Sequence, residues 1–423
     1  MKLKRYPKIK EKVYYDILKN GMHVFYLPQE GFQEKMAILA TSFGSFHSLL
    51  PLDDKKKTTI PLGVAHFLEH RMFTLNQKDA SQYFADLGAT SNAYTTYDRT
   101  AYYFKTTDHF YENLEILLKM CGSFESSVQQ IENEKQIIIE ELNMYQDDPY
   151  TKLLMSLYQN AYQNHPIRYD IGGTIESVNQ TDKAILNACF EKYYHPSNLT
   201  LVIAGDLKEE EIESFLNQHL ILASKDFEYQ KLSFKEPSYV LNPKTFIQGN
   251  VSLPLFGILF KLPPYQKKQD CQKELLKTEI LLNYFFSSSG IYTEPWLKSK
   301  IINSGIGYYH CCNIDLNFII LYNINKDYEN TIQNLLSIFD KKHWNMSKND
   351  FSRIKNKMIG EYLKNYSEGC NLAKEFLTYH LDGFDYFKEI DKLNEITIED
   401  IQKVYLQICE APTCIVIERG DAK

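Results

Sequence analysis

Residues 61–73 read Pro-Leu-Gly-Val-Ala-His-Phe-Leu-Glu-His-Arg-Met-Phe, and His66, Glu69 and His70 within them form an H-x-x-E-H run. If residues 64–73 are helical, the two histidines occupy positions i and i+4, so both imidazoles project from one face. Two imidazole nitrogens at that spacing can share one zinc ion. The carboxylate of Glu69 lies beside them, where it can take a proton from water that the metal has made acidic. The run therefore predicts a hydrolytic zinc site.

The same positions have a simpler interpretation. Two core or surface histidines beside a solvated glutamate would also produce the run, which matches by chance in roughly one or two chains of this length per hundred. The run alone leaves both interpretations open.

A third ligand is expected further along the chain, because catalytic zinc takes three protein ligands and leaves one position open. Residues 131–145 read Ile-Glu-Asn-Glu-Lys-Gln-Ile-Ile-Ile-Glu-Glu-Leu-Asn-Met-Tyr and predict a largely apolar helix. We expect this helix to be buried, and a buried carboxylate needs a partner or a metal ion. Glu134 and Glu141 share one face, whereas Glu140 is turned about 100° from Glu141. A charged stripe facing solvent is the alternative.

The two motifs together resemble those of the pitrilysin-like (M16) zinc peptidases, which include the mitochondrial processing peptidase and many bacterial processing peptidases. H-x-x-E-H is the inverzincin order, and E-x6-E follows it. Further matches are Asn92-Ala-Tyr-Thr-Thr-Tyr-Asp-Arg-Thr-Ala-Tyr-Tyr-Phe104, His165-Pro-Ile167, Gly172-Gly-Thr-Ile-Glu-Ser-Val178 and Tyr193-Tyr-His-Pro-Ser-Asn-Leu-Thr200. The resemblance covers the first half densely and the second half thinly.

The resemblance implies roles for individual residues. His66, His70 and Glu141 would bind one Zn²⁺ ion per chain, and Glu69 would be the general base. Glu134 would be an accessory acid that holds the geometry of the catalytic site. The native metal stays open between zinc, cobalt and manganese, because the affinity order alone does not decide it.

Composition limits the class of protein. At 423 residues the chain suits two domains of about 200 residues. A net charge of −7 without a basic block argues against nucleic acid as a partner. The sequence shows no secretory signal and no apolar stretch of about eighteen residues, so we expect no transmembrane segment and a cytoplasmic location. The eight cysteines form no C-x-x-C pattern and are expected to be reduced, mostly buried thiols.

Two short sequences that each occur twice, at nearly the same separation, indicate an internal duplication. Tyr111-Glu-Asn and Tyr328-Glu-Asn lie 217 positions apart, and Gly205-Asp and Gly420-Asp lie 215 positions apart. Each half combines strands with long helices, which favours an α+β fold of two homologous sandwich domains, each a mixed sheet packed with helices.

The expected boundaries are residues 1–225 for a zinc-binding domain, 226–250 for a linker and 251–423 for a second domain. Residues 282–286, which correspond to the histidine run, contain no pair of metal ligands. Only the first half is therefore expected to hold zinc. The resemblance implies that the two domains close like a clam around a peptide.

Residues 92–104 are a β-prone run rich in tyrosine. An ordinary internal strand is the simple interpretation, and an edge strand that binds substrate is the other. In pitrilysin-like peptidases the Asn-Ala strand borders the zinc and accepts the substrate as an added strand, through main-chain hydrogen bonds that tolerate varied sequences. The resemblance thus implies substrate contacts at Asn92, Ala93 and Tyr94.

The family also places an arginine and a tyrosine of the second domain over the zinc, in a pattern like L-R-x-x-G-x-x-Y. The corresponding stretch supplies Tyr308 as an oxyanion donor but has Ile302 at the arginine position. Lys298 or Lys300 could substitute, although an ammonium does not reproduce a planar fork of donors. A slipped alignment is the alternative.

Two-subunit members of the family divide these groups between chains. We therefore expect a paralogous subunit that supplies the Arg-Tyr pair, or a homodimer. The implied activity is zinc-dependent cleavage of peptides or unfolded segments, including the processing of ribosomally made precursors such as bacteriocins. A non-catalytic scaffold subunit is the rival, but such subunits generally lose ligands or the glutamate that this chain retains. A zinc hydrolase acting on a non-peptide amide would use the same ligands.

Overall fold

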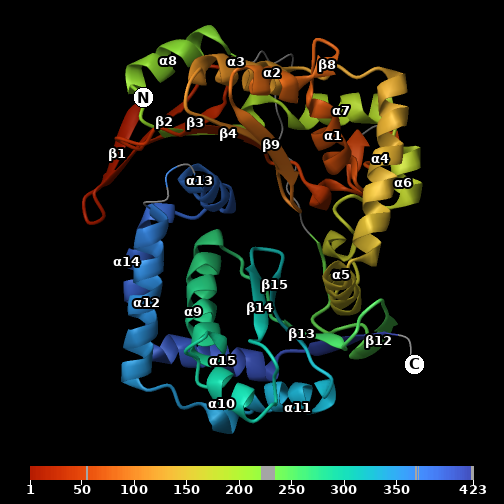
Figure 1. The fold of residues 1–423 in the computed structure, drawn as a ribbon, viewed down its shortest axis with the longest axis vertical. Helices are drawn as coiled ribbons and strands as arrows, with labels where there is room; N and C mark the ends of the chain where they lie inside the picture. Colours follow the sequence, from red (N-terminus) through yellow and green to blue (C-terminus); the bar gives the residue numbers. More distant parts are fainter. Residues whose placement is uncertain (54–55, 221–233, 367–368, 370, 421–423) are drawn as a thin grey trace. The chain divides into compact units, whose positions relative to one another are not determined.

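The computed structural model describes residues 1–53, 56–220, 234–366, 369 and 371–420. The chain divides into two compact units (Figure 1). The first unit comprises residues 1–143, 169–232 and 363–381, and the second comprises residues 144–168, 233–362 and 382–423.

The first unit contains a seven-stranded sheet of order β1-β2-β3-β11-β4-β10-β9. The strands are β1 (Lys2–Tyr6), β2 (Glu11–Ile17), β3 (His23–Pro28), β4 (Lys35–Thr41), β9 (Thr90–Thr95), β10 (Thr100–Thr106) and β11 (Leu199–Gly205). Strand β11 runs parallel to β3 and is buried along its whole length, which explains its continuous apolar sequence. Strand β9 pairs with β10 at one end of the sheet, so it is an edge strand.

The second unit contains a five-stranded sheet of order β12-β16-β13-β15-β14. The strands are β12 (Lys244–Gln248), β13 (Leu255–Lys261), β14 (Gly307–Cys312), β15 (Asn317–Ile324) and β16 (Thr413–Arg419). This order repeats the β3-β11-β4-β10-β9 part of the first sheet, including one parallel pair, β12 with β16. The expected α+β class with two homologous halves is confirmed.

Helices cover these sheets. In the first half of the sequence they are α1 (Val64–Met72), α2 (Ala80–Asp86), α3 (Phe110–Gly122), α4 (Val128–Asp147), α5 (Pro149–Ala161), α6 (Ile175–Gln180), α7 (Lys183–Tyr193) and α8 (Glu209–Gln218). In the second half they are α9 (Lys268–Phe286), α10 (Thr293–Lys298), α11 (Tyr328–Ile338), α12 (Lys348–Tyr366), α13 (Asn371–Asp382), α14 (Glu389–Glu395) and α15 (Ile398–Glu410). Short strand pairs are β5 (Pro51–Asp53) with β6 (Lys56–Thr59) and β7 (Thr74–Leu75) with β8 (Lys78–Asp79).

Each unit contains one helix from the other half of the sequence. Helix α5 packs against β13 and β16 of the second unit (Figure 1). Within the first unit, the ring of Phe376 on α13 contacts the ring of Phe25 on β3 in a tilted arrangement, with centroids 5.2 Å apart, and Lys374 Nζ lies 3.6 Å from the centre of the Tyr103 ring. The two helices occupy equivalent places in the duplicated order of elements, so the exchange is reciprocal.

The expected domain boundaries differ from these units in two respects. Residues 244–248, inside the expected linker, form β12, because their backbone pairs with β16. Residues 144–168 belong to the second unit, because α5 packs against β13 and β16. Residues 363–381 belong to the first unit, where Phe376 of α13 contacts Phe25 of β3. Residues 226–233 of the expected linker lie outside the described residues.

Two composition-based expectations concern membranes and thiols. No helix within the described ranges is long and apolar enough to cross a membrane. The described cysteines are free thiols, of which Cys311 and Cys409 are half-buried and the others are buried. Cys370 lies outside the described residues.

Candidate metal centre

Close backbone packing sets the start of helix α1. Gly63, which precedes the helix, has a φ of +82°, a conformation that favours glycine. A Cβ atom on Gly63 would lie 2.1 Å from the carbonyl oxygen of Gly172, and one on Gly173 would lie 2.6 Å from the carbonyl oxygen of Leu62. The Gly-Gly pair at residues 172–173 therefore lets a distant loop contact the start of the histidine helix.

The first unit brings together the three predicted ligands. Helix α1 carries His66 and His70, and α4 carries Glu141. Glu141 Oε2 lies 3.7 Å from His66 Nε2 and 3.3 Å from His70 Nε2. A tetrahedral ion with bonds of about 2.0 Å holds its ligand atoms about 3.3 Å apart, so this donor set fits zinc. Among the residues that the structure describes, these three are the one group of His, Cys, Asp or Glu side chains close enough to hold a metal ion.

The electrostatics of the group also suit a cation. Burial lowers the pKa of His66 to about 4, with a smaller contribution from His70, so His66 is a neutral imidazole at pH 7. Burial lowers the pKa of His70 as well, but hydrogen bonds to Glu134 and Glu141 outweigh it and raise the pKa to about 9. Two carboxylates thus hold a proton on His70 in the metal-free protein, and a metal ion would compete with that proton.

Glu134 and Glu141 lie about two turns apart on α4. They therefore share one side of the helix, as the sequence predicts. The Oε1 atom of Glu134 is 3.0 Å from His70 Nδ1. A carboxylate on the Nδ1–H of an imidazole leaves Nε2 free as a ligand atom.

The burial of α4 differs from the sequence-based expectation. Ile138 and Leu142 are buried, but Ile137 is 53% exposed. Consecutive apolar residues point in different directions on a helix, so only one stripe of α4 reaches the core. Glu134 lies in that stripe, Glu141 lies at its border, and Glu140 faces solvent.

Glu69 lies on α1 next to the edge strand β9. Thr95 Oγ1 donates a hydrogen bond of 2.6 Å to Glu69 Oε2. Burial raises the pKa of Glu69, and the hydrogen bond from Thr95 opposes that rise. A carboxylate whose pKa is raised toward neutrality is better matched to proton transfer at pH 7 than a solvated one.

The predicted substrate residues lie on β9. Cross-strand pairing places Asn92 opposite Tyr103, on the sheet face that contacts α13, and Ala93 and Thr95 on the face toward α1. The internal-strand interpretation is therefore wrong for β9, although it holds for β10. Tyr94 lies on the same face as Asn92.

Tyr308 lies on β14 of the second unit. It packs against the hydrophobic core of that unit, where Ile302 is only 1% exposed. The position expected to carry arginine is thus a core position in this chain. The role of Tyr308 as an oxyanion donor stays a prediction.

Two side chains at the candidate metal centre were not predicted from the sequence. Thr95 contacts Glu69, and Arg71 contacts Glu134. The alternation of β9 places Thr95 on the face of Ala93, which was the available signal. Arg71 directly follows His70, but its partner Glu134 is distant in sequence.

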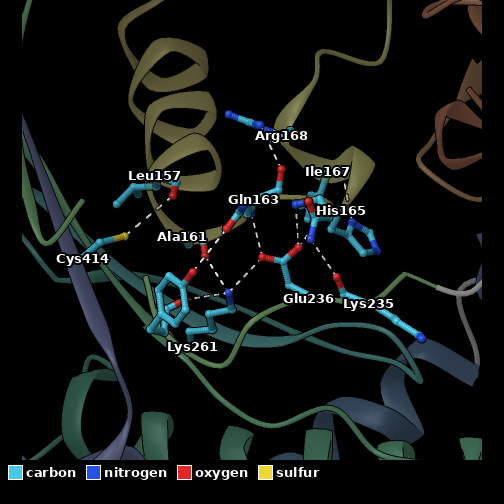
Figure 2. A network of polar contacts seen from close by, with 12 residues as sticks. Leu157, Ala161, Gln163, His165, Ile167, Arg168, Lys235, Glu236, Lys261 and Cys414 are labelled. Atoms are coloured by element: carbon cyan, nitrogen blue, oxygen red, sulfur yellow. Dashed lines mark hydrogen bonds and ion pairs between the residues drawn. The ribbon is translucent and has the colours of Figure 1, made fainter. Parts of the chain in front are cut away.

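A second polar network lies in the second unit and has a structural role. Figure 2 shows Glu236 accepting hydrogen bonds from the backbone N–H groups of residues 163–165, at 2.7, 2.8 and 3.0 Å. Lys261 Nζ lies 3.2 Å from Glu236 and also donates to the carbonyl oxygens of Ala161 and Tyr239. His165 Nδ1 accepts from the N–H of Ile167. The His-Pro-Ile motif is therefore a buried turn that follows α5.

Known proteins resemble most of this chain. The family model for insulinase (peptidase family M16) matches residues 56–175, and the model for the M16 inactive domain matches residues 182–358. The uncharacterized zinc protease YmfH of Bacillus subtilis is 30% identical over 404 residues, which cover 94% of each chain. The mitochondrial-processing peptidase subunit beta of Dictyostelium discoideum is 22% identical over 374 residues, covering 81% of this chain and 76% of that one.

A solved structure with the same fold is the M16-like peptidase from Alicyclobacillus acidocaldarius. It superposes with a TM-score of 0.88 at 25% identity, covering 97% of this chain and 99% of that chain. His66, His70 and Glu141 lie within the segment that matches the insulinase model, and the segment that matches the inactive-domain model contains none of these three residues.

Proposed function

This chain belongs to peptidase family M16, and from that premise we propose that it is a zinc-dependent endopeptidase whose chemistry is carried by the first unit. The observation that carries the proposal is the convergence of His66, His70 and Glu141 beside the carboxylate of Glu69. Names of relatives alone would not distinguish an active member from an inactive one. The retained ligands and glutamate favour an active member.

Each residue has a distinct task in this proposal. His66, His70 and Glu141 hold the ion, and Glu134 orients His70 through Nδ1. When bound, zinc polarises the peptide carbonyl and lowers the pKa of a water molecule. Glu69 takes a proton from that water and delivers it to the departing amine.

Strand β9 is the proposed substrate contact. The N–H of Ala93 donates to the side-chain oxygen of Asn92 at 2.8 Å. Since β9 has a neighbouring strand on one side only, an extended peptide can pair with its other edge through main-chain hydrogen bonds. Such pairing depends little on side chains, so the substrates would be peptides or unfolded segments, such as ribosomally made precursors.

A partner chain is a further part of the proposal. Position 302, where the family pattern has an arginine, is a buried isoleucine in this chain. A paralogous subunit would then supply the cation and the donor for the oxyanion, because a second copy of this chain carries the same isoleucine. Size-exclusion chromatography of a co-expressed pair, with activity assays on each peak, tests this. Full activity of a pure homodimer would rule out the need for a paralogue.

Neighbouring glutamates of α4 provide a matched test of the ligand assignment. Glu141→Gln removes a ligand, whereas Glu140→Gln changes the adjacent exposed carboxylate. We expect wild type and Glu140→Gln to bind one zinc ion per chain and to cleave a quenched peptide library. Glu141→Gln should lose both properties. Normal zinc content in Glu141→Gln would contradict the assignment.

A further inference from the structure

We propose that Arg71 is a positioning residue of the metal centre, which holds Glu134 in the orientation that His70 requires. This inference rests on the proposed function, because it assigns Arg71 a task toward the bound ion. Arg71 itself contacts none of the three ligands in the proposal; it acts through Glu134.

The guanidinium of Arg71 is held from three directions. Its Nη1 donates to Glu134 Oε2 at 2.7 Å, its Nε to Ser126 Oγ at 3.2 Å and its Nη2 to Thr74 Oγ1 at 3.0 Å. The side chain is only 11% exposed. Ser126 and Thr74 are themselves buried, so they fix the plane of the guanidinium.

The two oxygens of Glu134 have different partners. Oε2 accepts from Arg71, and Oε1 lies 3.0 Å from His70 Nδ1. A carboxylate bound at both ends cannot rotate without losing one of the two contacts. The relay Arg71–Glu134–His70 therefore fixes the plane of the imidazole and directs Nε2 toward Glu141, 3.3 Å away.

Arginine suits this position better than lysine. A guanidinium stays charged at all relevant pH values and offers donors in a rigid planar fork, whereas an ammonium is a single compact point. Lysine at residue 71 could contact Glu134 but could not also reproduce the fixed contacts with Ser126 and Thr74. We therefore expect partial function from lysine and loss of the relay with methionine.

The other histidine has no comparable support. His66 Nδ1 is buried and has no hydrogen-bond partner among the described residues. Gly172 lies beside it, since a Cβ there would be 3.5 Å from His66 Nδ1. No described residue forms a hydrogen bond with His66 Nδ1, so a second relay would not compensate for the loss of the Arg71 relay.

A purely structural role for Arg71 predicts a different result. In that case the arginine would join α1 to α4 without affecting the ion. Lys135 provides a matched control, because it is a buried cation on α4 that bonds Glu132 and the carbonyl oxygen of Asn179 rather than Glu134. Lys135→Met removes a buried charge from α4, the helix that carries Glu134, and leaves the Arg71–Glu134–His70 relay intact.

The experiment measures metal binding rather than activity. Metal-free wild type, Arg71→Met, Arg71→Lys and Lys135→Met are titrated with Zn²⁺ against a competing chelator, and with Co²⁺ by visible absorption. Arg71→Met should weaken zinc binding about 10- to 100-fold and change the Co²⁺ spectrum. Arg71→Lys should recover part of the affinity, and Lys135→Met should match wild type. Wild-type affinity and spectrum in Arg71→Met would overturn the inference.

Glu134→Gln tests whether the effect passes through Glu134. If it does, Arg71→Lys/Glu134→Gln should bind zinc no more weakly than Glu134→Gln alone, whereas additive losses would contradict the relay. This comparison does not use Arg71→Met, so it still tests the relay if that variant does not fold. Failure of wild type to bind zinc would overturn the proposed function together with the inference, which distinguishes it from a failure of the inference alone.

Discussion

The hydroxyl of Thr95 donates a 2.6 Å hydrogen bond to Glu69 Oε2 and so joins the edge strand β9 to α1, the helix that carries His66 and His70. Thr95 Oγ1 also lies 3.3 Å from Thr100 Oγ1, whose hydroxyl donates to the carbonyl oxygen of Phe43. The proposed base is therefore fixed by the same strand that would bind the peptide.

Replacing Thr95 should slow turnover without removing the metal. Thr95→Val keeps the shape of the side chain but loses the hydrogen bond to a charged group, which is worth about 1.5–3 kcal/mol. If that interaction orients Glu69 for proton transfer, kcat should fall about 10- to 100-fold at unchanged zinc content. Thr95→Ser should retain most activity, and Thr90→Val, at an exposed position of the same strand, serves as the control. Steady-state kinetics would contradict this account if Thr95→Val behaved as wild type.

Acid should destabilise the first unit through His47. The side chain is 2% exposed, and burial lowers its pKa to about 4. Between the ordinary pKa of 6.5 and this value the unfolded chain binds a proton that the folded chain does not. The free energy of unfolding therefore falls as the pH drops from 6.5 to 4, by about 3 kcal/mol from this residue.

Urea unfolding of metal-free protein at several pH values measures that contribution. His47→Asn cannot take up the proton, so its stability should fall less steeply than that of wild type between pH 6.5 and 4. Equal slopes for His47→Asn and wild type would show that His47 does not contribute.

The network in Figure 2 predicts a large loss of stability when Lys261 is replaced. Lys261→Met leaves Glu236 buried without its cation, although the backbone N–H groups of residues 163–165 remain. Removing one partner of a buried ion pair typically costs about 3–5 kcal/mol. Lys298→Met, at an exposed helix pair, should cost far less, because solvent screens that pair. Chemical unfolding that gave similar costs for the two variants would contradict the structural role of the network.

Local sequence patterns predicted the parts of the site that depend on helix periodicity. The spacing of His66 and His70 requires only that one segment be helical, and Glu134 and Glu141 follow from the same geometry on a second helix. The resemblance to the peptidase family then predicted that the two helices supply ligands to the same ion. The repeated Tyr-Glu-Asn and Gly-Asp residues predicted the duplication that the two sheets display.

Features that depend on long-range packing were not predictable from these patterns. An amphipathic helix does not specify which sheet covers its apolar face, so the exchange of α5 and α13 was missed. Ile137 was expected to be buried because its apolar character was counted without its direction on the helix. Arg71 could not be assigned, because its partner Glu134 is 63 residues away in sequence.

We propose that Glu69 is the base of a zinc endopeptidase, and replacing its carboxylate by an amide in Glu69→Gln tests this role. The substituted amide would keep the size of the side chain and an oxygen for Thr95 but could not take up a proton at neutral pH. Zinc content and cleavage of a quenched peptide library are measured for wild type and variant, alone and with a paralogous chain. We predict one zinc ion per chain in both proteins and a fall in turnover of about 100- to 10,000-fold in the variant. Near-normal turnover by Glu69→Gln would show that Glu69 is not the base, and no cleavage by zinc-loaded wild type in either preparation would show that the chain is not a zinc endopeptidase.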